Sequence, residues 1–238
     1  MPPLALLAGG MATRLRPVTA SIPKSMVEVA GEPFISHQLR LLVREGITDV
    51  VICCGYLGDQ IIDFVGDGAR FGCRVRYSSD GDRPLGTGGA LRRALPLLGE
   101  CFLVIYGDSY LEVNFREVFD AFRHSRKPAL MTVFRNVGRW DTSNVEFVNG
   151  VIRRYDKVNR NPAMLHIDYG LGVLDAGAMR LHPADQAFDL ADHYRDLVSR
   201  GLLAGYEVHQ RFYEIGSPAG LAETDAYLRG RAGAGIKN

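Results

Sequence analysis

The chain has 238 residues, of which 47% are hydrophobic and 23% are charged, the balance of an ordinary globular protein. This length fits one α/β domain or two small ones. The 28 Lys and Arg residues exceed the 27 Asp and Glu residues by one, so no overall field draws the chain to nucleic acid or to an anionic membrane. Any binding of phosphate must therefore depend on basic groups placed locally.

The N-terminus and the cysteines favour a reducing, cytoplasmic setting. The first apolar residues are few, lack a basic segment and run straight into Gly9, so they do not form a signal peptide. No stretch has the length that a membrane-spanning helix needs. The four cysteines form no C-x-x-C pair, which disfavours a zinc or thioredoxin-type site. Cys53 and Cys54 fall in an apolar run and are expected to be buried in a strand.

Apolar runs and helical patterns alternate through the first 134 residues. The expected strands cover residues 4–8, 49–53, 74–78, 101–106 and 129–134, and the expected helices cover 34–45, 59–65, 88–98 and 115–126. Strands that are apolar throughout indicate burial on both faces. The alternation predicts an α/β fold with a Rossmann-like, mostly parallel sheet and helices on both faces.

The pattern changes after residue 134. The turn Asn149-Gly150 separates two short strands, at 144–148 and 151–155, and predicts a hairpin. A strand at 166–174, a helix at 190–200, a strand at 203–208 and a closing helix at 218–229 follow. Residues 230–238 are rich in glycine and alanine, and we expect a frayed tail there. Because no repeat or linker is evident, residues 1–238 are predicted to form a single domain.

A glycine-rich loop, LAGGMATRLRP at residues 7–17, follows the first expected strand. Gly9 and Gly10 let the backbone approach a ligand closely, and free N–H groups in such a loop can hold phosphate oxygens. Arg14 and Lys24 are placed to neutralise phosphate charge. The loop is not a Walker A loop, because no Gly-Lys-Ser/Thr closes it, and it lacks the G-x-G-x-x-G dinucleotide fingerprint.

This loop resembles the opening signature of the sugar-1-phosphate nucleotidyltransferase family, Leu-Ala-Gly-Gly-x-Gly-Thr-Arg-Leu-x-Pro followed by Lys-Pro. The chain has Ala12 where the family has a glycine, and Ser25 after Lys24 where the family has proline. The resemblance implies that Arg14 and Lys24 clamp a triphosphate and stabilise the leaving pyrophosphate. It also implies nucleotide contacts by Leu7, Gly9, Gly10, Thr13, Asp80, Gly86 and Thr87.

Two carboxylates are candidates for a metal site. Asp108 follows an apolar strand at its carboxyl end, where ligands bind in open α/β sheets, and it matches a Gly-Asp of the family. Residues 214–218, EIGSP, resemble the family's Asp-Ile-Gly-x-Pro, with Glu214 in place of aspartate. The resemblance implies that Asp108 and Glu214 hold Mg²⁺, which prefers oxygen ligands. A helix cap is the structural alternative for Asp108.

The phosphate of a sugar needs a cation of its own. Residues 153–157, RRYDK, resemble the family's Glu-Lys element, which implies that Lys157 binds this phosphate and that Asp156 lies where the family has a sugar-contacting glutamate. Residues 167–172, IDYGLG, resemble Ile-Asn-Ala-Gly-Ile-Tyr, which implies that Asp168 and Tyr169 lie beside the sugar. The alternatives are an ordinary charged strand end for the first segment and a core-packing tyrosine in the second.

The segment that would read the base is most similar to one subgroup of the family. Residues 84–90, PLGTGGA, resemble those of heptose and mannose 1-phosphate guanylyltransferases. A carboxylate here would accept hydrogen bonds from guanine N1–H and N2–H₂ and would disfavour uracil or thymine. Asp80 is the candidate, although a solvated loop acid is the favoured interpretation of that residue. The short chain also matches the compact N-acetylmuramate 1-phosphate uridylyltransferases.

These features together predict an enzyme that joins a nucleoside triphosphate, with GTP favoured, to a heptose- or mannose-type sugar 1-phosphate. The products would be a nucleotide-sugar and pyrophosphate, with Mg²⁺ as the cofactor. The resemblance implies a glycosyltransferase-A-like fold in which residues 1–134 bind the nucleotide and a small β-rich region, residues 135–229, binds the sugar phosphate. A UTP- or CTP-using enzyme and a catalytically inactive nucleotide-sugar-binding subunit are the alternatives. No nucleic acid or membrane partner is expected, and a homo-oligomer is left open.

Overall fold

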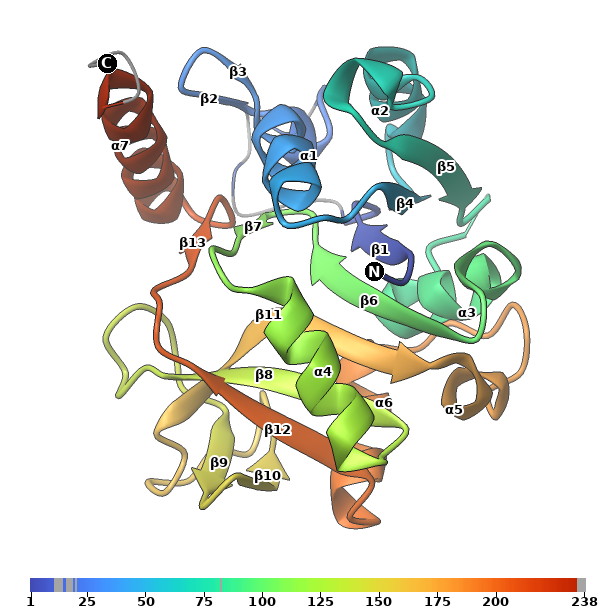
Figure 1. The fold of residues 1–238 in the computed structure, drawn as a ribbon, viewed down its shortest axis with the longest axis vertical. Coiled ribbons are helices and arrows are strands. Elements are labelled where there is room, and N and C mark those ends of the chain that lie inside the picture. The colour runs from blue at the N-terminus through green and yellow to red at the C-terminus, as the bar shows by residue number, and fades with distance from the viewer. Residues whose placement is uncertain (11–14, 16–18, 20, 82, 235–238) are drawn as a thin grey trace.

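The computed structural model describes residues 1–10, 15, 19, 21–81 and 83–234, in which a central sheet is flanked by helices (Figure 1). Within this part of the chain the main sheet has nine strands, in the order β10-β9-β11-β6-β1-β4-β5, with β8 pairing with β11 and β12 pairing with β8. The predicted α/β fold with a Rossmann-like mixed sheet is therefore confirmed.

Four strands from the first half of the chain run parallel: β1 (Leu4–Leu7), β4 (Asp49–Cys54), β5 (Arg74–Ser79) and β6 (Cys101–Tyr106). β1 lies in the middle, with Leu4 opposite both Val50 of β4 and Leu103 of β6. The carboxyl ends of these strands consequently meet at one edge of the sheet, where ligands bind in open α/β folds.

The other half of the sheet is mixed in direction. β11 (His166–Asp175) is antiparallel to β6 and to β8 (Ala129–Arg135), and β12 (Leu203–Val208) runs parallel to β8. The predicted hairpin is confirmed as β9 (Val145–Val148) and β10 (Val151–Tyr155). Both residues of its Asn149-Gly150 turn have positive φ, +50° and +79°, as a tight two-residue turn with the strand twist requires.

Alternate residues of β1 face the two helix layers. Leu4 and Leu6 belong to a core shared with α1 (Phe34–Arg44), α2 (Gly58–Val65) and α4 (Phe115–Ser125). Ala5 belongs to a second core, shared with α3 (Gly86–Leu98), α5 (Ala176–Arg180) and α6 (Leu190–Ser199). Helices thus cover both faces of the sheet, as the alternating pattern predicted.

The last helix packs beside the N-terminal half of the chain. α7 spans Pro218–Ala234, so it continues into the segment expected as a tail as far as residue 234, and residues 235–238 lie outside the described part. Leu228 of α7 belongs to a third core with Tyr110. Asp225 accepts a hydrogen bond from the backbone N–H of Ala30 at 2.7 Å, which holds α7 next to the β2–β3 hairpin (Figure 1).

Several elements are too short to leave a periodic pattern, and the sequence did not predict them. They are the strands β2 (Glu28–Val29), β3 (Glu32–Pro33), β7 (Ser109–Tyr110) and β13 (Tyr213–Glu214), the helix α5, and the 3-10 helices Lys24–Met26 and Ala69–Phe71. Across the described residues, no helix combines the length and apolar character needed to cross a membrane.

Candidate functional site

Glycines bring three loops together at the carboxyl edge of the sheet. A Cβ on Gly55 would lie 2.6 Å from the carbonyl oxygen of Gly9, and a Cβ on Gly107 would lie 2.8 Å from the carbonyl oxygen of Leu7. A side chain at Gly55 or Gly107 would overlap the neighbouring backbone, because interiors are already close-packed. The loops that follow β1, β4 and β6 therefore meet backbone to backbone.

A cavity of about 330 Å³ opens at this edge of the sheet. It gathers most of the residues predicted to bind the nucleotide together with two predicted catalytic residues, namely Leu7, Gly9, Gly10, Asp80, Gly86 and Thr87, with Lys24 and Asp108. Thr13 and Arg14, which were predicted to act beside them, lie outside the described residues. We call this space the glycine-loop cavity.

Asp80 is buried in the wall of the glycine-loop cavity, with 8% of its surface exposed, so the expectation of a solvated loop acid is wrong. Its Oδ2 accepts a hydrogen bond from the backbone N–H of Leu85 at 3.2 Å. Arg93 of α3 donates to its carbonyl oxygen at 2.6 Å, which fixes the loop. Burial raises the pKa of the Asp80 carboxyl.

The first residues of α3 line the glycine-loop cavity and also contact the segment at the start of α6. Gly86 has a φ of +70°, and a Cβ there would lie 2.6 Å from the carbonyl oxygen of Phe188. The Thr87 hydroxyl donates to Asp189 at 3.0 Å and accepts from the N–H of Leu190 at 2.8 Å. These contacts join α3 to the start of α6 across 102 positions of sequence, so no local pattern could indicate them.

Lys24 and Asp108 form an ion pair, with Nζ 2.6 Å from Oδ2. Gln38, buried on α1, donates to the carbonyl oxygens of Tyr106 and Ser109 at 3.0 and 2.8 Å. These bonds hold the turn that carries Asp108. The sequence patterns did not single out Gln38, although a glutamine among the apolar positions of a helix is a signal for a buried polar contact.

A second cavity, of about 590 Å³, adjoins the first and shares Tyr106 and Asp108 with it. It also contains three residues predicted for the sugar phosphate and one predicted for the metal: Lys157, Asp168 and Tyr169, with Glu214. We call this space the second cavity. The fold therefore brings the two predicted metal carboxylates to one cavity, beside most of the residues predicted to bind the second substrate.

Two short paired strands bring the acids close to each other, since Glu214 of β13 lies opposite Ser109 of β7, the residue that follows Asp108. The Glu214 carboxylate accepts hydrogen bonds from the N–H of Gly216 and from the hydroxyl of Ser217, the latter at 2.8 Å. It is thus turned toward the start of α7, where backbone N–H groups lack partners in the helix.

Two carboxylates fit a Mg²⁺ site, because Mg²⁺ is commonly held by one or two carboxylates while substrate phosphates and water complete its octahedron. Over the described ranges, no group of three or more His, Cys, Asp or Glu side chains gathers in a way that would hold a metal. A metal held by Asp108 and Glu214 would therefore take its other ligands from substrate or solvent.

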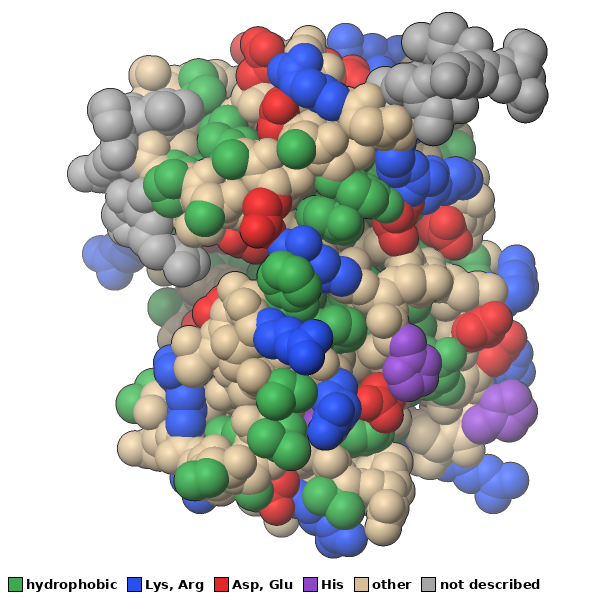
Figure 2. All heavy atoms as spheres, turned by 90° about the vertical axis from the view of Figure 1, so that its left-hand side faces the viewer, with side chains coloured by type: hydrophobic (Ala, Val, Ile, Leu, Met, Phe, Trp, Pro, Cys, Tyr) green, Lys and Arg blue, Asp and Glu red, His purple; other side chains and the backbone are tan. Residues whose placement is uncertain are grey.

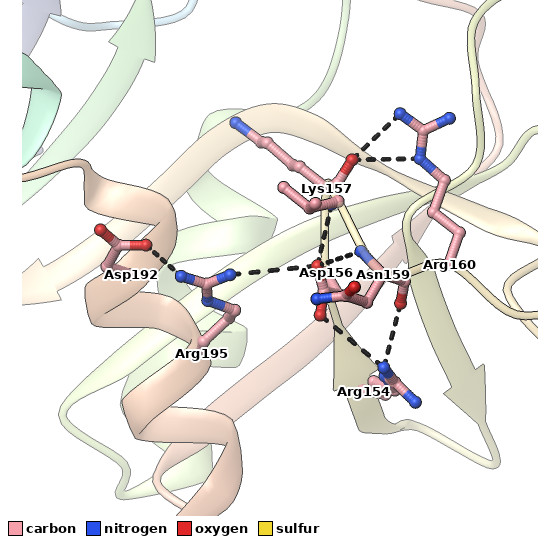
Figure 3. Close-up of polar contacts among 8 residues, drawn as sticks. Arg154, Asp156, Lys157, Asn159, Arg160, Asp192 and Arg195 are labelled. Atoms are coloured by element: carbon pink, nitrogen blue, oxygen red, sulfur yellow. Dashed lines mark hydrogen bonds and ion pairs between the residues drawn. The ribbon is translucent and has the colours of Figure 1, made fainter.

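Asp156 fixes the turn that follows β10 (Figure 3). Its Oδ1 accepts from the backbone N–H groups of Asn159 and Val158, each at 2.8 Å, and these hydrogen bonds lower its pKa. Arg154 and Arg195 lie 3.7 and 3.9 Å from the carboxylate. Asp156 is not among the described residues that line the second cavity, so its contacts are those of a turn residue rather than of a sugar ligand.

Lys157 extends from the same turn (Figure 3), and its Nζ lies 5.7 Å from the centre of the Tyr106 ring. Asp168 accepts a hydrogen bond from the Tyr155 hydroxyl at 3.0 Å, and its N–H donates to the Asn144 side chain at 2.9 Å. The second cavity therefore has a cation at its rim and an anchored carboxylate in its wall.

Tyr169 packs in the core, with 2% of its surface exposed. Its ring centre lies 6.3 Å from that of Phe134 and 6.1 Å from that of Phe212. The Tyr169 ring therefore packs in the core, as the alternative interpretation expected. The residue also lines the second cavity. Among the described residues, the buried hydroxyls of Tyr169 and Tyr106 have no hydrogen-bond partner.

The fold and the site are those of an α/β protein with a glycine-walled cavity at the carboxyl ends of its parallel strands, the usual place for a nucleotide in such folds. Residues 5–157 match the family described as "Nucleotidyl transferase". The chain belongs to the nucleotidyl transferase family.

Relatives and solved structures agree with this membership. An N-acetylmuramate alpha-1-phosphate uridylyltransferase of Neisseria meningitidis serogroup B is 41% identical over 115 residues, covering 48% of this chain and 50% of the relative. Mannose-1-phosphate guanyltransferase 2 of Candida glabrata is 35% identical over 232 residues, covering 94% of this chain and 64% of the relative. In both cases the chain spans less than two thirds of the relative's length.

The crystal structure of HddC from Yersinia pseudotuberculosis complexed with GMP-PN has the same fold. Its TM-score to this chain is 0.79, with 24% sequence identity, and the match covers 96% of this chain and 100% of that one. This likeness concerns the fold alone.

Proposed function

We propose that the protein transfers a nucleotidyl group from a nucleoside triphosphate to a sugar 1-phosphate, giving a nucleotide-sugar and pyrophosphate. The observation that carries the proposal is the pair of adjoining cavities that share Tyr106 and Asp108. The glycine-loop cavity suits a nucleotide, and the second cavity offers Lys157 for another phosphate. Two substrates held this way would present their reacting phosphates to each other beside Asp108.

In the proposed reaction, an oxygen of the sugar phosphate forms a bond to the α-phosphorus of the triphosphate. The bond from that phosphorus to the oxygen bridging to the β-phosphate breaks, and pyrophosphate leaves with the electron pair. No general base is required, because the attacking oxygen is already anionic. Positioning and charge stabilisation therefore supply the catalysis.

The chain's cations would perform these two tasks. Lys157 would hold the sugar phosphate, and Lys24 would stabilise charge on the leaving pyrophosphate, with Arg14 as its proposed partner. Lys24 now pairs with Asp108 at 2.6 Å, so this contact would loosen as the triphosphate arrives. Asp108 and Glu214 are the residues that would hold Mg²⁺. When bound there, Mg²⁺ would supply charge neutralisation between two mutually repelling anions.

GTP is the favoured triphosphate in this proposal. The support is Asp80, a buried carboxyl in the wall of the glycine-loop cavity, since a carboxylate accepts the hydrogen bonds that the guanine edge donates. A mannose- or heptose-type sugar 1-phosphate is the favoured partner, and the Candida relative, a mannose-1-phosphate guanyltransferase, agrees with it.

A second candidate uses UTP. The Neisseria relative, an N-acetylmuramate alpha-1-phosphate uridylyltransferase, has the higher identity of the two, 41% against 35%, although over about half as many residues. This pairing would keep the same transfer chemistry and the same cations, and would change only the contacts to the base and the sugar.

The test is pyrophosphate release by the purified chain with GTP, UTP, CTP and dTTP, each combined with mannose, heptose, glucose and N-acetylmuramate 1-phosphates. The proposal expects Mg²⁺-dependent release with one pair far above the others, and that pair identifies the base and the sugar together. Binding of nucleotide without release from any pair would contradict the proposal and favour an inactive binding subunit.

A further inference from the structure

Trp140 is the chain's only tryptophan, and neither the motif nor the proposed transfer chemistry assigns it a role. It lies on the loop between β8 and β9 and lines the second cavity. Its exposed fraction is 46%, which is high for a large aromatic side chain. Asp141 and Thr142, which follow it, line the same cavity.

The loop that carries Trp140 is held in place by Asn136, which is fully buried. The Asn136 side-chain oxygen accepts from the N–H of Trp140 at 3.2 Å, and its amide nitrogen donates to Asp141 and Ser143. The backbone N–H of Asn136 donates to Leu165 at 3.1 Å. These bonds hold the backbone of the loop at Trp140 in place.

The side chain of Arg211 holds the indole of Trp140 in place. Its guanidinium carbon lies 3.5 Å from the centre of the Trp140 ring, and Arg211 is ion-paired with Glu223 of α7. A guanidinium stacked at this distance occupies one face of the indole. The opposite face and the ring edge are then the parts that Trp140 can present to the cavity.

The surroundings of Trp140 suit a ligand with one apolar and one polar side. The loop between β8 and β9 lies at the left of Figure 1, the side that Figure 2 turns toward the viewer, and basic and hydrophobic side chains lie next to each other in the middle of that face. A pyranose ring has C–H groups on its faces and hydroxyls around its edge. An aromatic surface can bury the C–H groups, while Asp141 and Asp168 in the same wall can accept hydrogen bonds from hydroxyls.

We propose that Trp140 forms the wall against which the sugar ring of the second substrate stacks, so that it sets the affinity and selectivity for that sugar. This inference depends on the proposed function, because it places the sugar 1-phosphate in the second cavity. Trp140 is a binding residue in this account and takes no part in the transfer step. Arg211 is a positioning residue that acts through the indole.

Because Trp140 is the only tryptophan of the chain, the intrinsic tryptophan fluorescence reports on this position alone. The emission of Trp140 is recorded while the chain is titrated with mannose 1-phosphate, glucose 1-phosphate or N-acetylmuramate 1-phosphate, and with inorganic phosphate as the control. We expect a saturable blue shift with the sugar phosphate that supports turnover, because stacking removes the indole from water. Inorganic phosphate, which has no ring, should leave the emission unchanged.

Variants provide a readout that does not depend on fluorescence. Trp140→Ala should raise the KM for the sugar 1-phosphate about tenfold while kcat and the KM for the triphosphate stay within about twofold. Trp140→Phe keeps an aromatic surface and should stay within about threefold of wild type. Val158→Ala removes another exposed apolar side chain, one that is not among the residues lining the second cavity, and serves as the matched control with unchanged constants.

The outcomes separate this inference from the function on which it depends. Turnover with unchanged emission and an unchanged KM in Trp140→Ala overturns the role of Trp140 and leaves the proposed transfer standing. An equal rise in KM in Trp140→Ala and Trp140→Phe also overturns the role of Trp140, because loss of the stacking surface would then not explain the weaker binding of the sugar 1-phosphate. No pyrophosphate from any substrate pair overturns the proposed function and, with it, the assignment of Trp140.

Discussion

At the scale of single residues, the proposed preference for GTP depends on the buried carboxyl of Asp80. Its carboxyl is 8% exposed in the wall of the glycine-loop cavity, and one oxygen is already used by the N–H of Leu85. Burial raises its pKa, since a buried carboxylate loses hydration. A guanine edge that donates hydrogen bonds would favour the ionised form.

Asp80→Asn is expected to lower kcat/KM for GTP by about tenfold or more while leaving UTP unaffected, because the amide replaces an acceptor with a donor but can still accept from Leu85. The measurement is kcat/KM for GTP and UTP in parallel over a series of pH values. Wild-type preference for GTP should fall as the pH drops through the raised pKa, and the variant should lack this dependence. An unchanged GTP-to-UTP ratio would remove Asp80 from base recognition.

Motifs predicted which residues gather at the site better than they predicted what each side chain contacts. Lys24 and Asp108 each follow a recognisable signature, and the fold brings them within 2.6 Å. Asp156 also fits its motif, yet its carboxylate is used by its own turn. Trp140 belongs to no motif, and only the three-dimensional structure relates it to the second cavity.

At the scale of elements, the start of α7 determines where the Glu214 carboxylate lies. A Cβ on Gly220 would lie 2.8 Å from the carbonyl oxygen of Glu214 and closer still to its carboxylate. The position therefore has no room for a side chain unless β13 or the helix shifts. The paired strands β7 and β13 that position Glu214 are two residues long, so the sequence shows no strand periodicity there.

Gly220→Ala is expected to destabilise the chain by roughly 1–3 kcal/mol, as forced overpacking does, and to impair Mg²⁺-dependent turnover by displacing Glu214. Gly230→Ala in the same helix is the matched control, because nothing lies within 4 Å of a Cβ there. That control should gain up to about 1 kcal/mol from helix propensity. Urea unfolding and turnover of both variants test the idea, and equal behaviour of the two would refute it.

At the scale of the whole molecule, α6 packs in the second core and carries a buried histidine. His193 of α6 is 2% exposed, and its Nδ1 lies 2.9 Å from Nε2 of His182. Burial lowers the pKa of His193 to about 4, and the nearby His182 adds to this effect. The folded chain therefore keeps His193 neutral at pH values where the unfolded chain, with a pKa of 6.5, takes up a proton.

The free energy of unfolding should accordingly be highest above pH 6.5 and fall as the pH drops toward 4. Between pH 7 and 4.5 the wild type should lose about 2 kcal/mol more than His193→Gln, from the difference between the two pKa values. His209→Gln, at an exposed position, should keep the wild-type dependence. Urea unfolding at both pH values measures this, and parallel profiles for wild type and His193→Gln would contradict it.

Part of the overall architecture follows from local sequence patterns, and part depends on pairings between segments that lie far apart in the sequence. The alternation of apolar runs with helices predicted the parallel half, because β1, β4 and β6 are buried on both faces. The order and direction of β11, β8 and β12 depend on pairings between distant segments, such as Leu203 with Ala129. Local patterns located those strands within one residue at either end, but they contained no information about their partners.

In the proposed transfer, two anionic substrates react beside a divalent ion held at Asp108. The most direct measurement is pyrophosphate release with and without Mg²⁺, comparing wild type with an Asp108→Asn variant whose circular dichroism and melting temperature match. The account predicts strong Mg²⁺-dependent release in wild type and loss of most activity in the variant. Turnover at the wild-type rate in Asp108→Asn, or in wild type without any divalent ion, would contradict it.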